Sequence, residues 1–295
     1  MINFNRFYKP FNLISIVLVF ISIMLLTFKG LNYGVDFKGG TLIELRTTDE
    51  NINTSKLRDS FNKMNLGDVN VKKFGNETDF LIKFEKKDIN PNSIDVIKKE
   101  LITLIGNSFN FRRVESVGPK VSSELLKAGV VAIISALAAM LFYIWIRFEW
   151  QFSLGAILAL FHDVLITLGF FSLFSLEINL SIVAAVLTIV GYSMNDTVVI
   201  FDRVRENLRK FSDIKIYELT NISINETLSR TIITSVTTLL ALVSIYIFGG
   251  EILKGFSFAM ILGVIFGTYS SIYIANPVLV KLRVSQKTII KDNTD

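Results

Sequence analysis

The chain has 295 residues, of which 51% are hydrophobic, and its formal net charge is +5. Soluble domains rarely reach its mean hydropathy of +0.50, so the composition predicts a membrane protein with several spans rather than a soluble enzyme. The absence of cysteine excludes disulfides and thiolate metal sites, and a single histidine argues against a histidine-built metal site. We therefore expect no enzyme activity, no metal and no cofactor other than protons, and the basic excess suits cytoplasmic loops rather than nucleic-acid binding.

Six apolar runs are long enough to span a bilayer, at about 20 residues each. They are Phe11–Phe28, Leu126–Ile146, Phe152–Phe174, Leu180–Phe201, Ile224–Phe248 and Phe256–Ala275. The first run is long for a signal peptide and no small-residue cleavage pattern follows it, so we interpret it as a retained membrane helix. The expected parts are an N-terminus with the first helix (1–30), a polar domain (31–125), five further helices (126–275) and a tail (276–295).

The polar domain alternates between strand and helix patterns, and its roughly 90 residues allow a modest core. Its expected strands are Thr41–Thr47, Val69–Phe74, Phe80–Phe84 and Phe109–Val117, and its expected helices are Thr54–Met64 and Pro91–Ile105. This β-α-β-β-α-β order predicts a ferredoxin-like α+β domain between the first and second spans.

Basic residues near the ends of the spans gather on one side of the membrane. That side holds Arg6, Lys9, Arg147, Arg203, Arg205, Arg209, Lys210, Lys215, Lys281, Arg283, Lys287 and Lys291, whereas Lys29, Lys127 and Lys254 fall on the other. The positive-inside rule therefore predicts cytoplasmic N- and C-termini and an extracytoplasmic α+β domain.

Two spans carry ionisable residues inside their apolar runs: Asp196, next to Asn195, in the fourth and Arg230 in the fifth. Such residues are rare in membranes and are usually functional. Ser223-Ile-Asn-Glu226 has the form of a capping box, which would begin the fifth helix at Ser223. Asp196 and Arg230 then lie about 7 Å and about 10 Å inside the cytoplasmic ends of antiparallel helices, where they can pair. We interpret them as a proton relay, and a structural salt bridge is the alternative.

His162 and Asp163 lie about 15 Å into the third span, near the middle of the membrane. A lone histidine there is often only a packing residue, but the adjacent acid suggests an accessory role in the proton path. Asn195 and Thr234 are further polar residues within the membrane that we assign to the same accessory group.

The last three spans each present a face of small and polar residues. The residues are Ser181, Ala185, Thr188, Tyr192, Asn195 and Asp196 on the fourth span, Arg230, Thr234, Thr237, Ala241 and Ser244 on the fifth, and Ala259, Gly263 and Gly267 on the sixth. Such faces indicate helix contacts or a hydrated path rather than lipid. Six spans with one external domain suggest half of a pseudo-symmetric transporter, so we expect the faces of the fourth and sixth spans to bind a partner.

Two glycine motifs flank the polar domain. One contains Gly34, Asp36, Gly39 and Gly40 before the first strand, and the other is Gly118-Pro119 after the last strand. Glycines at such junctions are most simply turn residues, and a proline can open the helix that follows. We interpret both motifs as structural, and direct contact with a substrate is the less favoured alternative.

These segments together resemble the SecD/SecF family of protein-export membrane proteins, in its SecF branch, which is related to the RND transporters. The resemblance covers Met1 to about Arg283 through GVDFKGG, VGP, FHDV, VGYSMNDTVVIFDRVREN, SRTIITSVTTLL and GTYSSIYIANP. It implies a multi-pass protein of the bacterial inner membrane that pairs with SecD and associates with the SecY–SecE–SecG translocon and YajC. Such a protein would use the proton motive force to help unfolded preproteins across after SecA-driven insertion.

The same resemblance places the family's essential aspartate and arginine on Asp196 and Arg230. The residues alone do not identify a polypeptide substrate. They leave open half of an RND-type exporter of lipids or small molecules, or a membrane scaffold without transport activity.

Overall fold

The computed structural model describes residues 1–49, 52–64, 66–73, 76–84, 91–106, 108–211 and 214–289. The chain forms two compact units. Residues 1–32 and 131–295 make a helical unit, and residues 33–130 make an α/β unit. The predicted boundary at 31 is close to the observed one, whereas the second boundary lies later than 125 because the helix that follows Gly118 begins inside the smaller unit.

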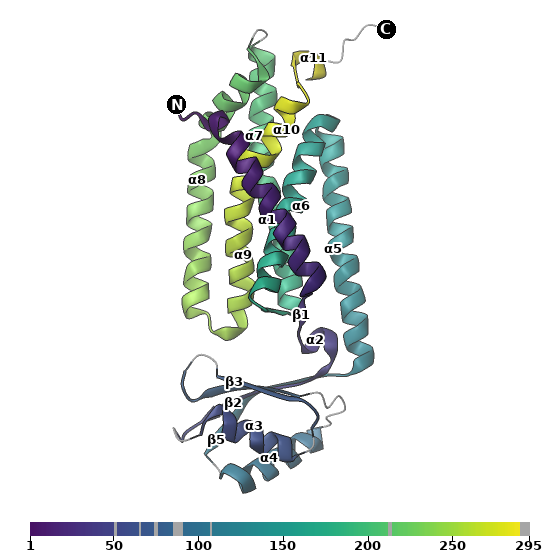
Figure 1. Ribbon diagram of the computed structural model, residues 1–295, viewed down its shortest axis with the longest axis vertical. Helices are drawn as coiled ribbons and strands as arrows, with labels where there is room; N and C mark the ends of the chain where they lie inside the picture. Colours follow the sequence, from purple (N-terminus) through teal and green to yellow (C-terminus); the bar gives the residue numbers. More distant parts are fainter. Residues whose placement is uncertain are drawn as a thin grey trace. The chain divides into compact units, whose positions relative to one another are not determined.

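The helical unit is built from long helices joined by short turns (Figure 1). Its elements are η1 (Phe4–Phe7), α1 (Tyr8–Phe28), the later part of α5 (Pro119–Arg147), α6 (Trp150–Leu173), β6 (Glu177–Ile178), α7 (Leu180–Lys210), α8 (Ile216–Phe248), α9 (Glu251–Ser270), η2 (Ser271–Ala275), α10 (Asn276–Lys281) and α11 (Gln286–Ile289). Among the described residues, six helical segments are long and apolar enough to cross a membrane, which confirms the predicted number of spans.

Three of the six spans form the centre of the helical unit. In their most apolar windows, 61% of residues are buried in α6, 50% in α7 and 56% in the last span, against 11% in α1, 11% in α5 and 17% in α8. The core is made mostly of aliphatic side chains together with several phenylalanines, and Phe152, Ala159 and Phe201 are fully buried. The three outer helices leave much of their apolar surface open, as expected where lipid or another membrane protein covers them.

Most spans are longer than their apolar runs, because polar helix ends continue beyond the hydrocarbon. α7 extends to Lys210, and α8 begins at Ile216 rather than at Ser223. The predicted capping box is therefore wrong. The Ser223 hydroxyl lies inside α8 and donates to the Leu219 carbonyl at 2.9 Å, which is a common alternative for serine within a helix.

The sixth span changes its winding before a proline. η2 is a π-helical turn that follows α9 and precedes Pro277. Proline has no N–H for the preceding turn, and π turns accommodate such interruptions. The Asn276 side chain donates to the Ser271 carbonyl at 2.7 Å and so satisfies part of the widened turn. Beside it, a side chain at Gly155 would lie 2.8 Å from the Ala275 carbonyl, so α6 approaches this turn closely.

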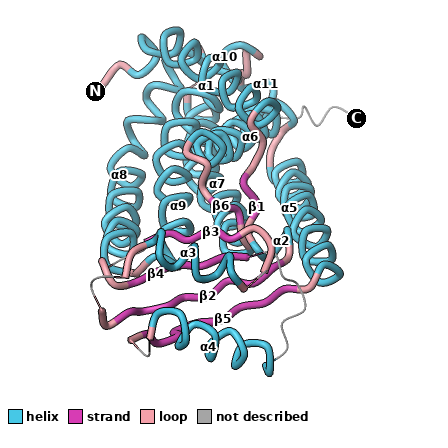
Figure 2. The backbone as a smooth tube through the Cα atoms, turned by 60° about the horizontal axis from the view of Figure 1, so that its bottom comes forward, coloured by secondary structure: helices cyan, strands magenta, loops and turns pink. Residues whose placement is uncertain are grey.

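The α/β unit has the predicted β-α-β-β-α-β order after two short elements that the sequence did not predict, β1 (Asn32–Tyr33) and α2 (Val35–Lys38). The remaining elements are β2 (Gly40–Thr47), α3 (Thr54–Lys63), β3 (Val69–Lys73), β4 (Asp79–Phe84), α4 (Pro91–Ile105), β5 (Phe109–Val117) and the start of α5. The strands β2, β3, β4 and β5 form one antiparallel sheet in the order β3-β4-β2-β5 (Figure 2). Phe74, the last residue of the predicted second strand, lies outside the described residues.

The core of the α/β unit joins both helices to the sheet. Ile43 and Leu45 of β2 alternate with less buried neighbours, and they meet Leu57 of α3 and Leu101 of α4 in one cluster. All four side chains are fully buried. The alternation of period two in the strand and the helical spacing in α3 and α4 therefore identified the correct inward faces.

Candidate functional site

Asp196 lies at the junction of three helices. It belongs to α7, and only 2% of its surface is exposed. Its carboxylate accepts a hydrogen bond from the Thr268 hydroxyl of α9 at 3.2 Å, and Thr268 in turn pairs with the Ser235 hydroxyl of α8 at 2.7 Å. A hydroxyl group can act as donor or acceptor, so the Thr268 hydroxyl can form a hydrogen bond with either the charged or the protonated form of the Asp196 carboxyl group.

Arg230 lies on α8 at a level close to that of Asp196, but its side chain is exposed. Among the described ion pairs none joins Arg230 to Asp196. Asp196 lies 14 residues before Lys210, the end of α7, and Arg230 lies 14 residues after Ile216, the start of α8. At 1.5 Å per residue, each side chain is about 21 Å along its helix from that end. The sequence predicted that they lie at similar depth, and their contact stays a prediction.

His162 and Asp163 occupy a second buried polar cluster. Asp163 has no exposed surface and accepts from the hydroxyls of Ser193 on α7 and Ser270 on α9, the latter at 2.7 Å. His162 Nδ1 lies 2.8 Å from an Asp163 oxygen. The ring stacks on Tyr269 with centroids 5.8 Å apart. A buried acid with three polar partners is well satisfied in the packed interior.

This second cluster reaches the outer helix α1. The Tyr269 hydroxyl donates to the Phe11 carbonyl at 2.7 Å and pairs with the Ser15 hydroxyl at 2.7 Å. The Nε2 atom of His162 has no hydrogen-bond partner among the described residues. The two buried acids belong to separate clusters, but Ser193, which donates to Asp163, precedes Asp196 on α7 by about one helical turn.

The other predicted accessory residues do not join either acid. Asn195 is exposed on α7. The Thr234 hydroxyl donates within its own helix to the Arg230 carbonyl at 3.1 Å, and the Thr234 carbonyl accepts from the Tyr192 hydroxyl at 3.3 Å. Three hydroxyl residues do contact the acids, Ser193, Thr268 and Ser270, and the sequence analysis missed all three. Hydroxyl residues inside apolar runs were the signal that could have found them.

The glycine face of the sixth span is used inside the chain, which corrects the expectation that it binds a partner. A side chain at Gly263 would come within 2.3 Å of Ile189, and one at Gly267 within 3.1 Å of Ser193. Both neighbours belong to α7. The close approach of α7 and α9 therefore depends on these glycines, and it brings Ser193 and Ser270 to the same carboxylate.

The two glycine motifs of the α/β unit meet each other. Gly39 has φ +76°, where a side chain is strained, and a side chain there would lie 3.2 Å from the Val117 carbonyl and 3.7 Å from Pro119. Gly40, the first residue of β2, pairs with Val117, the last residue of β5. Pro119 opens α5, as predicted. Gly34 precedes the single-turn helix α2, which contains Asp36. Gly39 thus adopts a positive φ between α2 and β2, and the structural interpretation of both motifs stays a prediction.

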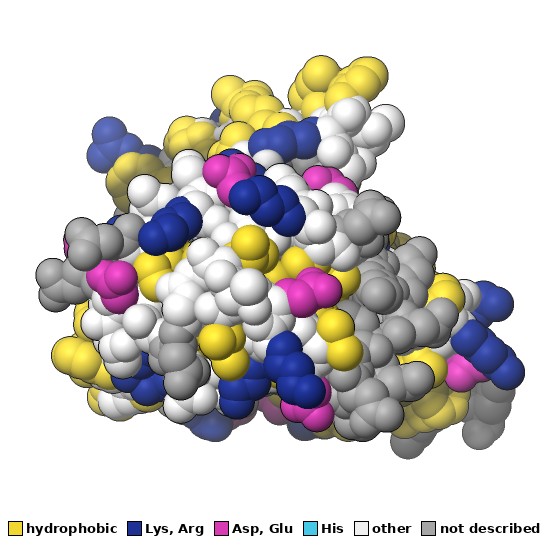
Figure 3. Space-filling model, turned by 90° about the horizontal axis from the view of Figure 1, so that it is seen from below, with side chains coloured by type: hydrophobic (Ala, Val, Ile, Leu, Met, Phe, Trp, Pro, Cys, Tyr) yellow, Lys and Arg dark blue, Asp and Glu magenta, His cyan; other side chains and the backbone are white. Residues whose placement is uncertain are grey.

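The surface of the α/β unit is of mixed charge. Figure 3 shows basic and acidic side chains interspersed there, which is typical of a solvated face. The Arg46 guanidinium donates to Asp79 at 2.5 and 2.6 Å and holds the pKa of that carboxyl group below its usual range. Burial lowers the pKa of Lys83 to about 8. The described residues contain no acidic or histidine cluster able to hold a metal ion.

Comparisons with known proteins agree with this architecture. Residues 97–285 match the family model of the "Protein export membrane protein SecD/SecF, C-terminal", and residues 25–50 match the "SecD/SecF GG Motif". The protein translocase subunit SecF of Rickettsia bellii is 46% identical over 279 residues, which cover 94% of this chain and 92% of that one. The corresponding subunit of Cereibacter sphaeroides is 44% identical over 90% of this chain and 84% of its own.

Among solved structures, the fold is similar to SecDF of Thermus thermophilus, a translocon-associated membrane protein. The TM-score is 0.85 at 34% identity, over 95% of this chain and 38% of that chain. A structure of SecDF in its super-membrane-facing form gives a TM-score of 0.70 at 33% identity. The present chain thus spans only 38% of the length of the SecDF chain that it resembles.

Proposed function

The chain belongs to the SecD/SecF family of protein export membrane proteins, and on this premise we propose that it uses the proton motive force to assist preprotein translocation. The relatives that it resembles include protein translocase subunits, which supports a role in the translocase machinery. The observation that supports proton use is the buried Asp196, whose carboxylate accepts from Thr268 of α9, which in turn pairs with Ser235 of α8.

The energy available to such a site is sufficient for a conformational change. One proton moving through about 100 mV releases about 2.3 kcal/mol, which shifts a two-state ratio about fifty-fold. Protonation removes the charge of Asp196 and so changes its attraction to Arg230 and its bonding to Thr268. α7, α8 and α9 meet at this residue, so their packing would respond to the proton.

The proposal also includes a partner that resembles SecD, because the chain spans 38% of SecDF. α7 is one of the three central helices, yet one narrow stripe of its surface is exposed and carries Ala184, Thr188, Gly191 and Asn195. Small and polar residues suit contact with another helix better than contact with lipid. We propose that this stripe, and not the glycine face of the sixth span, meets the partner. The SecY–SecE–SecG translocon, YajC, SecA and unfolded preproteins are further proposed partners through the same complex.

We further propose that the helical unit spans the bacterial inner membrane with both termini in the cytoplasm. The N–H of Ile2 donates to Asn225 near the start of α8 at 2.8 Å, so the first residues lie at the end of the unit where α8 begins. Figure 1 shows α11 at the same end. Arg203, Arg205 and Arg209 of α7 also lie there, in agreement with the positive-inside rule.

The proposed proton role is tested by Asp196→Asn, which keeps the size of the side chain but cannot carry a proton between two sides. Translocation of a preprotein into vesicles containing the full complex is measured with and without a proton gradient. We expect the variant to assemble and to lose the stimulation that the gradient gives to the wild type. A wild-type response in the variant would contradict the proposal and leave a translocase subunit in which Asp196 is structural.

The proposed partner face is tested by Gly191→Leu, with Ala138→Leu on α5 as the matched control. Both positions are exposed in the isolated chain, and nothing lies within 4 Å of a side chain added at Gly191. We expect the first variant to reduce co-purification with the SecD-like partner and the second to leave it unchanged. An equal loss for both would mean that overall packing is disturbed, and no loss for Gly191→Leu would mean that the stripe is not the interface.

A further inference from the structure

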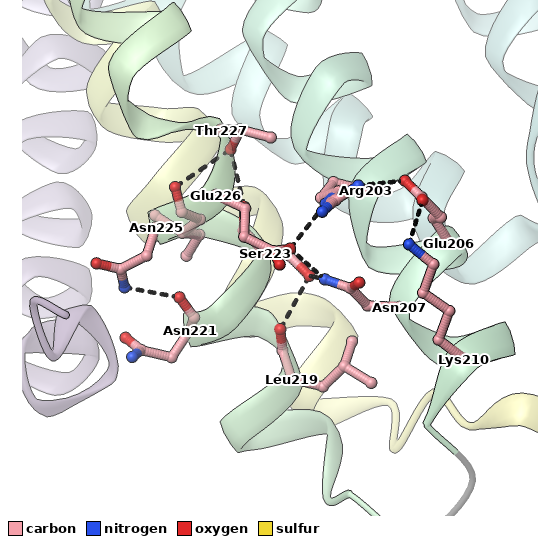
Figure 4. Close-up of polar contacts among 11 residues, drawn as sticks. Arg203, Glu206, Asn207, Lys210, Leu219, Asn221, Ser223, Asn225, Glu226 and Thr227 are labelled. Atoms are coloured by element: carbon pink, nitrogen blue, oxygen red, sulfur yellow. Dashed lines mark hydrogen bonds and ion pairs between the residues drawn. The ribbon is translucent and has the colours of Figure 1, made fainter.

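A cluster of polar side chains connects the C-terminal part of α7 to the N-terminal part of α8 (Figure 4). Arg203 Nε donates to Glu226 at 2.7 Å, and Arg203 Nη1 donates to Glu206 at 2.5 Å. The Asn207 side chain donates to the same oxygen of Glu226 at 2.6 Å and to Ser223 at 3.0 Å. The simplest role of this cluster is to hold two helices together, but its position relative to Arg230 suggests a second one.

The hydrogen bonds between α7 and α8 fix how the two helices are aligned. Residue 207 lies opposite 223, residue 203 opposite 226, and residue 192 opposite 234. At this alignment Arg230 lies about 3 Å along the axis from the level of Asp196 and about 6 Å from Glu226. Arg230 is therefore placed between two carboxylates, one buried in the helical unit and one nearer the helix start.

Arg230 and Glu226 also share one face of α8, because they are four residues apart. Long side chains in a helix lean toward its N-terminus, which directs Arg230 toward Glu226. A glutamate four residues before a basic residue is the more favourable orientation of such a pair. Only one oxygen of Glu226 is used by Arg203 and Asn207, and the Arg230 guanidinium forms no ion pair with any described residue.

We propose that Glu226 is the second counter-ion of Arg230, which it binds when a proton neutralises Asp196. This inference rests on the proposed proton role of Asp196. In the exchange the proton binds the Asp196 carboxylate, the guanidinium turns toward the start of α8, and Glu226 releases Arg203. A counter-ion stabilises a charged guanidinium in a membrane helix, and Glu226 would supply one as Asp196 loses its charge.

The cluster can give up Glu226 without leaving another charge unpaired. Arg203 keeps Glu206, which also accepts from Lys210 at 2.6 Å. The exchange breaks the ion pair between Arg203 of α7 and Glu226 of α8. It replaces that pair with one between Glu226 and Arg230 within α8, so this ion pair no longer connects the two helices. Protonation of a buried acid would thereby loosen the packing of α7 against α8 at a distance from the acid itself.

Glu226 has two roles in this proposal: it pairs with Arg203 of α7, and it can pair with Arg230. Variants at each partner of the Arg203–Glu226 pair distinguish the two roles. Glu226→Gln and Arg203→Gln both break the link between α7 and α8, but only the first removes the second counter-ion of Arg230. We expect Glu226→Gln to lose about fivefold more of the gradient-dependent translocation than Arg203→Gln, which is the lower end of typical coupling between sites. Glu226→Asp keeps the carboxylate and is expected to restore part of the loss.

The assay uses vesicles that contain the full complex, and co-purification with the partner checks that each variant assembles. Equal losses for Glu226→Gln and Arg203→Gln, or a wild-type response of Glu226→Gln, would overturn the proposed exchange. The only role of the cluster would then be to hold α7 and α8 together. Asp196→Asn is measured in parallel. If that variant still responds to the gradient, the proton role fails, and this outcome is distinct from a failure of Glu226 alone.

Discussion

The close approach of α9 to α7 makes a quantitative prediction at Gly263. An alanine there places its Cβ 2.3 Å from Ile189 Cγ1 and 2.8 Å from Cδ1, well inside van der Waals contact. Ile189 is itself 1% exposed, so it has little room to move. Overpacking of this kind costs about 1–3 kcal/mol, whereas replacing glycine by alanine inside a helix gains about 1 kcal/mol.

Gly191→Ala is the matched control, because it makes the same helix substitution on α7 where nothing lies within 4 Å. We expect it to stabilise by about 1 kcal/mol and Gly263→Ala to be less stable than this control by about 1–3 kcal/mol. In a chain of this size the difference corresponds to about 2–12 °C in the midpoint of thermal unfolding. The measurement is the thermal midpoint of the purified chain in detergent.

A double-mutant cycle with Ile189→Ala identifies the contact. Ile189→Ala alone should destabilise by about 2–5 kcal/mol, because it leaves a cavity. Combined with Gly263→Ala, the new methyl fills part of that cavity, and we expect a coupling of about 0.5–3 kcal/mol in the favourable direction. Equal midpoints for Gly263→Ala and Gly191→Ala, or additive effects in the cycle, would refute the α7–α9 contact. The glycine face of the sixth span would then be available to bind a partner protein, as the sequence predicted.

Two further predictions concern topology and pH. A reporter fused after Lys72 should be extracytoplasmic and one fused after Lys287 cytoplasmic, as the basic residues require, and the reverse pattern would refute the proposed orientation. The lowered pKa of Asp79 means that its pair with Arg46 stabilises the α/β unit above the unfolded pKa of about 3.9, and that this contribution is lost as pH falls through the folded pKa. Hydrogen exchange of the full chain should show this acid loss in the wild type but not in Asp79→Asn, and an unchanged pH dependence in the variant would exclude the pair as its source.

The sequence by itself determined the features that depend on local pattern. Six apolar runs identified six spans, because hydrocarbon thickness fixes the length of apolar chain that a helix needs. Alternation at Ile43 and Leu45 identified a half-buried strand, and Gly39 identified a turn, because these depend on a period of two and on a positive φ. The unusual position of Asp196 was also visible, since a charge within an apolar run needs no tertiary information to be noticed.

Only the tertiary structure decided which side chains meet. Hydropathy could not show that the glycines of the sixth span pack on Ile189 of the same chain, because a small-residue face does not specify its partner. It could not show that Ser193 and Ser270 converge on Asp163, since hydrogen-bond partners come from helices remote in sequence. The start of α8 was misplaced for a related reason. The residues between Ile216 and Ser223 are helical because Leu219 and Thr220 are buried and Asn221 accepts from the Phe4 N–H, and a local cap signal does not detect such tertiary contacts.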